Sequence, residues 1–412
     1  MQARWAGAVG VLALLGSTGW AQGLETGGQL RAQWTQAQAA SVGPVAQANA
    51  LQPGRVADPD SGATLESELR ASGHGMTAVA TLQQQRWETH PSDGRAWMNE
   101  LYTSHDGGAW QFSAGKKIVG WDVGYGFRPN DMVQQEDRRA LVSTTLEGRP
   151  LLLAEHFGAS SAWSWVAVNP TGDAQDAGAR EPALAARYYR RDGALDWYGF
   201  ARSGAHTGAS VGAAAAWVAS DALELHGSVR YASHVDSTSM APQTSGLVSS
   251  NPWQASTQDD VTQALLGATW TNAQQVSLLA EAWWDGSAAS DAQWDAWFRR
   301  NTQLTALAAH GAPVAAVAGN LAWQAQAFNA TQSLRRSNVL LRLSWQNGAW
   351  QPALDVLFTP ADQGQVVTAS LTWQGDRVQV QAGLRANGGP DSAVTAQLPV
   401  QRTAYLMASW SF

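Results

Sequence analysis

Apolar residues recur at every second position along much of this chain, and this period most constrains the fold. In the segment 378–385 the even positions are apolar, whereas the odd positions are polar or glycine. The segments 367–373 and 339–345 repeat the alternation, and they end on Trp373 and Trp345. An amphipathic helix would repeat every 3.6 residues, so a period of two predicts β-strands that each have one apolar face.

The last nine residues, 404–412, show the same alternation at the carboxyl end. One row is apolar: Ala404, Leu406, Ala408, Trp410 and Phe412. The other row carries hydroxyl groups except at Met407. This ending resembles the C-terminal aromatic signal of Gram-negative outer-membrane β-barrel proteins of the porin-like kind, which is read by the barrel assembly machinery. The resemblance implies an assembly signal at Tyr405, Trp410 and Phe412, and a wall in contact with outer-membrane lipid and lipopolysaccharide.

The start of the chain predicts export. Arg4 precedes an apolar run from residue 6 to residue 15, and small residues follow up to Ala21. This is the layout of a secretory signal peptide. The run is shorter than the roughly 20 residues of a membrane-spanning helix. We therefore expect a signal peptide at residues 1–21 and one barrel domain at residues 22–412.

The composition fits an exported barrel. The chain has 40 glycines, 22 tryptophans, no cysteine and only 14% charged residues, which suits short strands with aromatic girdles. Without cysteine no disulfide framework is available, so a closed hydrogen-bonded ladder must supply stability. The net charge of −7 argues against a nucleic-acid partner.

Turn signals set the expected number of strands. Short turns are predicted near residues 73, 107, 160, 192, 221, 272, 348 and 375. Longer loops are predicted at 38–62, 88–94, 121–149, 170–180, 203–207, 235–257, 285–331, 360–364 and 387–401. Eight inner turns and nine outer loops give an all-β, antiparallel, up-and-down transmembrane barrel of 18 strands with both ends on the periplasmic side.

Sixteen strands is the alternative, with the first hairpin or the segment 139–148 misread. That segment has strand character, but adding it alone breaks the even parity, so we assign it to the preceding loop. A soluble β-sandwich or β-solenoid is disfavoured, because it gives no reason for tryptophans near strand ends.

The polar rows of the strands would face the lumen of such a barrel. The predicted pore-lining residues are Arg187, Arg202, Arg230, Glu281, Arg342, Asp355, Arg377, Gln379, Gln381 and Arg385. One interpretation pairs these charges across neighbouring strands and stiffens the wall. The other makes the late arginines a track for an anionic or hydroxyl-rich solute, since guanidinium groups stay charged and offer planar donor forks.

The segment 115–149 is the candidate for a pore-narrowing loop. It is rich in glycine and aromatic residues up to Phe127, and it resembles the segment that leads into the constriction loop of porin-like proteins. Its predicted constriction residues are Lys117, Asp122, Arg128, Asp131, Glu136, Asp137, Arg138 and Arg139. Long loops inside compact proteins are usually functional, although a surface loop held by its own aromatic residues is the alternative.

The segment 285–331 changes period and predicts helices in an outer loop. Ser290 is a suitable N-cap, Gly311 would end the first helix, and Pro313 opens a second apolar stretch. A self-packed cap on the barrel rim and a lid in its mouth both fit this pattern.

These features together predict a channel for passive diffusion of small polar or anionic solutes, with no cofactor and no metal. The eight histidines lack metal-ligand spacing, and no Gly-x-Ser-x-Gly motif occurs. His234 with Asp236, and His90 with Ser92 and Asp93, are the only arrangements near the outer rim that suit acid–base chemistry. A barrel enzyme and a plugged structural barrel are the alternatives.

Overall fold

A computed structural model describes residues 23–412 except 90, 137, 142–144 and 242–245. It contains one closed antiparallel barrel of 18 strands. Each strand pairs with its sequence neighbours, and β18 pairs with β1 to close the ring. The predicted signal peptide, residues 1–21, lies outside the described residues.

The strands differ in length by more than a factor of two. They are β1 (Glu25–Ala39), β2 (Gly62–Gly73), β3 (Met76–Trp87), β4 (Asp93–Asp106), β5 (Trp110–Lys117), β6 (Arg149–Phe157), β7 (Ser161–Val168), β8 (Ala183–Asp192), β9 (Leu195–Gly204), β10 (Gly208–Ser220), β11 (Leu223–Met240), β12 (Trp253–Thr271), β13 (Val276–Asp285), β14 (Ser337–Trp345), β15 (Trp350–Thr359), β16 (Gly364–Gln374), β17 (Val378–Gly388) and β18 (Val400–Ser411). The shortest strands are β5 and β7, with 8 residues each, and the longest are β11 and β12, with 18 and 19 residues.

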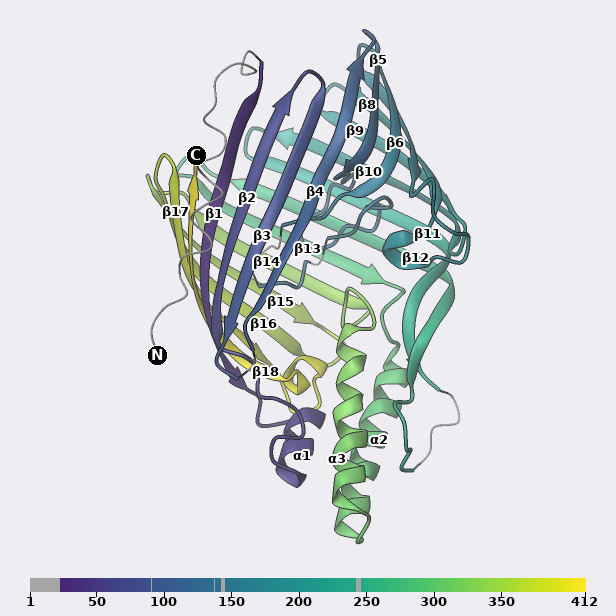
Figure 1. The fold of residues 1–412 in the computed structure, drawn as a ribbon, viewed down its shortest axis with the longest axis vertical. Helices are drawn as coiled ribbons and strands as arrows, with labels where there is room; N and C mark the ends of the chain where they lie inside the picture. The colour runs from purple at the N-terminus through teal and green to yellow at the C-terminus, as the bar shows by residue number, and fades with distance from the viewer. Residues whose placement is uncertain (1–22, 90, 137, 142–144, 242–245) are drawn as a thin grey trace.

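The prediction of 18 strands is confirmed, and the sixteen-strand alternative is wrong. All eight short turns lie where the turn signals put them, and all nine longer connections fall at the other end of the barrel. The described residues of 139–148 lie outside the strands, and 142–144 fall outside the description. We call the two ends of the barrel the turn end and the loop end. Figure 1 shows the C-terminus at the turn end, opposite the helices.

The two faces of the wall follow the predicted alternation. In β18, Leu406 and Trp410 are exposed on the outside, whereas Tyr405, Met407 and Ser409 are buried on the inside. Many large apolar side chains are exposed in this way on the outer face of the barrel, and such a surface is far larger than an ordinary soluble protein tolerates. The seam is sealed by main-chain hydrogen bonds, since Gly28 and Phe412 exchange two of 2.9 and 3.0 Å.

Three α-helices stand at the loop end: α1 (Pro44–Leu51), α2 (Asp291–Ala309) and α3 (Val314–Trp323). The predicted helical insertion is confirmed, because Ser290 forms a capping box with Gln293 and Gly311 has a positive φ of 87°. Three short 3₁₀ helices are η1 (Gly178–Arg180), η2 (Gln324–Asn329) and η3 (Val394–Gln397). No helix in the described part of the chain is long and apolar enough to cross a membrane.

The helices pack on one another as a cap on the rim. Ala48 of α1 is fully buried with Leu304, Val317 and Leu321 from α2 and α3. A second cluster joins Trp294, Trp297 and Phe328 to Val394 of η3. Residues of three outer loops therefore pack into two apolar clusters at the rim, and the sequence predicted only the part within residues 285–331.

Candidate functional site

The loop 118–148 folds back into the barrel and lies against its inner wall. Trp121, Met132 and Val133 are buried among inward-facing residues of β6–β10, including Val166 and Phe200. The inner face of these strands is largely apolar where the loop covers it, unlike an ordinary wet lumen. Burial of that face by the loop explains why it need not be polar.

Glu281 of β13 fixes the middle of the loop. Its carboxylate accepts hydrogen bonds of 2.6 Å from the main-chain N–H groups of both Tyr125 and Gly126. His226 of β11 lies 2.9 Å away through Nε2, and its Nδ1 lies 3.1 Å from Glu224. Glu281 is only 1% exposed, so its charge depends on these partners. A side chain at Gly126 would come within 2.6 Å of Leu340, which explains the glycine.

A second polar anchor joins the loop to β11. Ser228 Oγ donates to Asp122 at 2.8 Å, and it accepts a 2.7 Å hydrogen bond from Asn130 Nδ2. Arg230 donates to the carbonyl of Pro129 at 3.1 Å and to Ser210 at 3.1 Å. Burial raises the pKa of Asp122, although hydrogen bonds from Asn130 and Ser228 lower it in part.

Glycine on the wall makes room for this anchor. A side chain on Gly212 of β10 would overlap the Asn130 amide. Within the loop, Asp131 accepts from the N–H groups of Trp121 and Asp122, and it lies 3.2 Å from Arg128. Asp131 therefore shapes the loop from within, and Glu281 of the wall holds the loop in place.

An apolar contact lies between the two anchors. The rings of Phe127 and Trp283 stack with centroids 5.7 Å apart and an interplanar angle of 13°. Leu265 and Leu340 complete the buried cluster. Stacked aromatic pairs of this kind contribute about 0.5–1.5 kcal/mol beyond their area burial.

The later part of the loop contacts the strand wall and the helical cap. Glu147 pairs with Lys116 at 2.6 Å and with Arg95 at 2.8 Å, and the hydrogen bond from Lys116 is the main cause of its lowered pKa. Arg139 donates to the carbonyl of Phe328 at 2.8 Å, while its own carbonyl accepts from Arg385 of β17 at 2.8 Å. The loop thus links β5, β17 and the insertion 286–336.

The remaining predicted constriction residues take different places. Lys117 ends β5, donates to Ser113 at 3.2 Å and lies over the ring of Tyr102. Glu136 and Arg138 pair with each other at 2.7 Å. Asp137 lies outside the described residues.

Most of the predicted pore-lining charges are paired within the wall or its loops. Arg342 makes two 2.8 Å hydrogen bonds to Asp355 on the next strand, and its guanidinium lies 5.6 Å from the ring centroid of Tyr125. Arg187 is 3.9 Å from Glu155 and also lies over Trp121. This geometry follows the wall-stiffening interpretation more closely than that of an open arginine track.

One of these placements needs correction. Arg377 lies in the exposed turn before β17, not on the inward row of that strand. Gln379, Gln381 and Arg385 do lie on the inward row, half-buried and alternating with exposed Leu384. The expected row of three late arginines therefore contains two.

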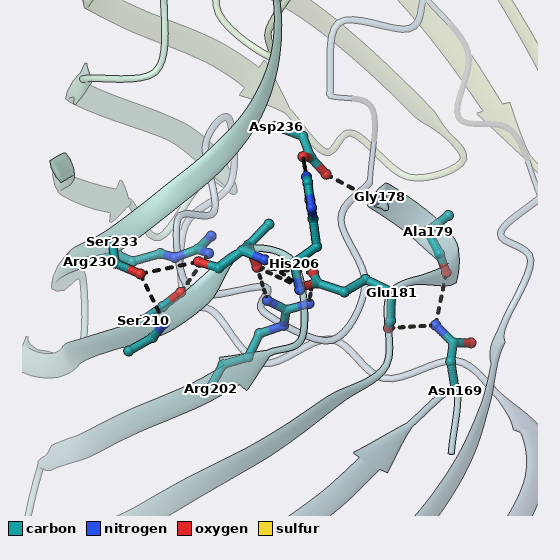
Figure 2. A network of polar contacts seen from close by, with 12 residues as sticks. Asn169, Gly178, Ala179, Glu181, Arg202, His206, Ser210, Arg230, Ser233 and Asp236 are labelled. Atoms are coloured by element: carbon teal, nitrogen blue, oxygen red, sulfur yellow. Dashed lines mark hydrogen bonds and ion pairs between the residues drawn. The ribbon is translucent and has the colours of Figure 1, made fainter. Parts of the chain in front are cut away.

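Figure 2 shows a polar network at the loop end of the barrel, which joins the loop before β8 to β9 and to the loop between β9 and β10. Glu181 accepts 2.6 Å hydrogen bonds from Arg202 and from the N–H of Thr207, and one of 2.7 Å from the N–H of His206. Burial raises the pKa of Glu181, but the hydrogen bonds from Arg202 and Thr207 outweigh it, so the net pKa is lowered. His206 in turn lies 3.0 Å from Asp236. Arg202 therefore stabilises two loops at the loop end of the barrel, through Glu181 and Thr207.

The residues considered for acid–base chemistry do not form a shared site. His234 lies 3.5 Å from Asp259 on the exposed surface, and Asp236 instead contacts His206. His90 lies outside the described residues. Within the described ranges, no three His, Cys, Asp or Glu side chains group closely enough to hold a metal ion.

An open polar cavity of about 500 Å³ lies across the lumen from the anchored part of the loop. It is bounded by β1, β2, β3 and β18, by Asp60 of the first outer loop, and by Leu141 of the inner loop. Gln33, Thr64 and Gln85 are among its lining residues. The sequence did not single out these amides and hydroxyls, nor Ser228, Asn130 and His226. The small residues at 212 and 228 were the available signal for a close approach by the loop.

Comparisons with known proteins find a similar fold among solved structures but no similar sequence. No family model matches the sequence, and no curated protein sequence is similar to it at a significant level. Among solved structures, Acinetobacter baumannii OccAB1 is similar over 94% of this chain and 96% of that chain, with 9% identity and a TM-score of 0.56. A triple mutant of the Rhodopseudomonas blastica porin covers 94% of this chain and 100% of its own, with 12% identity and a TM-score of 0.41. The similarity to OccAB1 supports a common barrel fold.

Proposed function

We propose that this protein is an outer-membrane channel for the passive diffusion of small polar or anionic solutes. The observation that carries the proposal is the loop 118–148, which is fixed to one inner wall at Glu281 and Ser228 while a polar cavity lies against the opposite wall. A loop that narrows a lumen without filling it gives a pore with a selective constriction.

The outer face supports placement in the outer membrane of a Gram-negative cell. It is apolar, and tryptophans such as Trp110, Trp270 and Trp345 are exposed near its turn end, as expected for an aromatic girdle at a lipid interface. Outer-membrane lipid and lipopolysaccharide are then the surrounding partners. Trp410 and Phe412, whose rings lie 5.0 Å apart, and Tyr405 are the proposed assembly signal for the barrel assembly machinery.

The test is planar-bilayer conductance of the refolded protein at two salt concentrations. We expect discrete current steps that scale with salt. A correctly folded barrel, verified by its heat-modifiable migration, that inserts without any conductance would overturn the proposal in favour of a plugged barrel.

A further inference from the structure

The polar cavity beside β1–β3 has an unusual charge pattern for an anion-selective pore. Among the described residues that line it, Arg31 is the only cation, whereas Asp60 and Glu66 are both acidic. Arg31 Nη1 lies 3.3 Å from Glu66 Oε1, and the Glu66 side chain is only 8% exposed. The single positive charge of the cavity is therefore paired with a buried carboxylate, so no excess positive charge attracts an anion there.

Amide groups continue from this ion pair along the wall. Gln83 donates to the second oxygen of Glu66 at 3.1 Å, and Gln85 donates to Gln83 at 3.1 Å. These two hydrogen bonds hold Gln83 of β3 against Glu66 of β2. They also orient Gln85, which lies nearer the loop end of β3. The carboxylate is satisfied by these wall residues and by Thr145 of the inner loop, whose hydroxyl donates to Oε1, and the surface offered to the lumen is mainly neutral and polar.

Several polar side chains of the cavity have no hydrogen-bond partner among the described residues. Gln33, Thr35 and Thr64 line it, and none of the three makes a side-chain hydrogen bond to another described residue. Gln33 and Thr64 are directly opposite each other on β1 and β2. Their amide and hydroxyl groups can each donate and accept, which matches the hydroxyl groups of a solute.

An aromatic ring stands at the loop end of the same cavity. Trp87 is the last residue of β3, and it lines the cavity on the inward row with Gln83 and Gln85. A side chain on Gly62 would lie 2.7 Å from this indole, so the glycine gives the ring its place against the wall. An indole presents an apolar face with one N–H donor, which suits the C–H face of a sugar ring.

We propose that this cavity selects neutral polyhydroxylated solutes, such as monosaccharides, over anions of the same size. The cavity volume lies within the range of about 300–1,000 Å³ that is usual for small-molecule sites. The inference rests on the proposed channel function and narrows its solute class. It assigns solute recognition to Gln33, Thr64 and Trp87. Because Arg31 is paired with Glu66, the cavity offers no excess positive charge to an anion.

The test is the swelling of proteoliposomes that contain the protein, in isotonic glucose, glucuronate or glucosamine with matched counter-ions. We expect glucose to enter faster than glucuronate. The double variant Gln33→Leu/Thr64→Val should lower the rate for glucose about fivefold. Trp87→Ala should also lower the rate of glucose entry.

The chain offers a matched control on the other strands. Gln379 and Ser409 are also an inward amide and hydroxyl directly opposite each other, on β17 and β18, outside the cavity. Gln379→Leu/Ser409→Ala should leave the glucose rate within about twofold of the wild type, since no cavity contact is lost.

The outcomes separate the two proposals. Equal entry of glucose and glucuronate, faster entry of glucosamine than glucose, or equal effects of the two double variants would overturn the solute class while the channel stands. Absence of both conductance and swelling in a folded barrel would overturn the channel itself.

Discussion

The two sides of the lumen use the same strand pattern for different purposes. On β6–β14 the inward residues are apolar or are engaged by the loop, as with Val166, Ser228 and Glu281. On β1–β3 the inward residues that line the open cavity are mostly amides and hydroxyls, together with one ion pair and Trp87. We call these the loop wall and the open wall.

The difference shows which charged residues of this barrel have a structural role. Glu281 and Arg230 are nearly inaccessible, and each binds main-chain groups of the loop as well as one side chain of the wall. Buried charges of this kind hold a segment in place because leaving them unpaired is costly. The neutral groups of the open wall need no such partners, and they remain available to solute.

Release of the loop should have the largest effect on the difference between the two walls. Glu281→Gln removes the charge that accepts from Tyr125 and Gly126 and contacts His226. We expect the free energy that holds the loop to fall by about 3–5 kcal/mol, while the barrel still folds. Single-channel recordings should then show larger and noisier currents.

The control for this variant is Glu224→Gln. Glu224 contacts His226 from the other side, but its side chain is 33% exposed. Its replacement should cost less than about 1 kcal/mol and leave the currents quiet. Equal noise in both variants would show that the histidine, rather than the carboxylate at Glu281, holds the loop.

The sequence predicted the barrel well because its signals are local. Alternation within ten residues sets a strand and its faces, and turn residues such as Asn347-Gly348 set the connections. The helix α2 is equally local, since Ser290 and Gly311 mark its ends. Arg377 was misplaced because the turn at Gly375 extends one residue farther than the alternation suggests.

The loop wall could not be predicted in the same way. Glu281 binds the main chain of Tyr125, which is 156 residues away, and a main-chain N–H leaves no mark on the sequence. A lone carboxylate on an inward row is equally compatible with an arginine partner on the next strand, as Asp355 has. Helix α1 was missed because its eight residues, 44–51, show little amphipathic pattern.

A second pair of variants tests which face of β17 meets lipid and which face meets the lumen. Leu384 of β17 is 63% exposed on the outer row near the middle of the strand, and Gln381 lies on the inner row. Leu384→Arg should cost about 2–4 kcal/mol of folding stability in a bilayer, because lipid cannot hydrate the charge. Gln381→Arg should cost much less. Reversed stabilities in a denaturant titration would place the lumen on the wrong side of the wall.

A third variant separates the loop wall from the rim. Arg230→Gln removes the donor to Pro129, whereas Arg202→Gln removes the donor to Glu181. Because hydrogen bonds from charged groups contribute about 1.5–3 kcal/mol, hydrogen exchange should quicken at residues 120–132 only in the first variant. In the second it should quicken at 178–182 and 205–207. Faster exchange at 120–132 in both would mean that the rim and the loop open together.

The smallest expected effect lies at the edge of the loop wall, at Arg342 of β14 and Asp355 of β15. Because the pair is bidentate and nearly neutral as a unit, Arg342→Gln leaves one carboxylate uncompensated in the lumen. The reversal potential in a potassium chloride gradient should then shift toward cations, with a change of about twofold in the permeability ratio. Adding Asp355→Asn removes that charge, so the double variant should return close to the wild type. An arginine that served as part of an anion track would behave differently, because its loss would shift the potential toward cations in the single and the double variant alike.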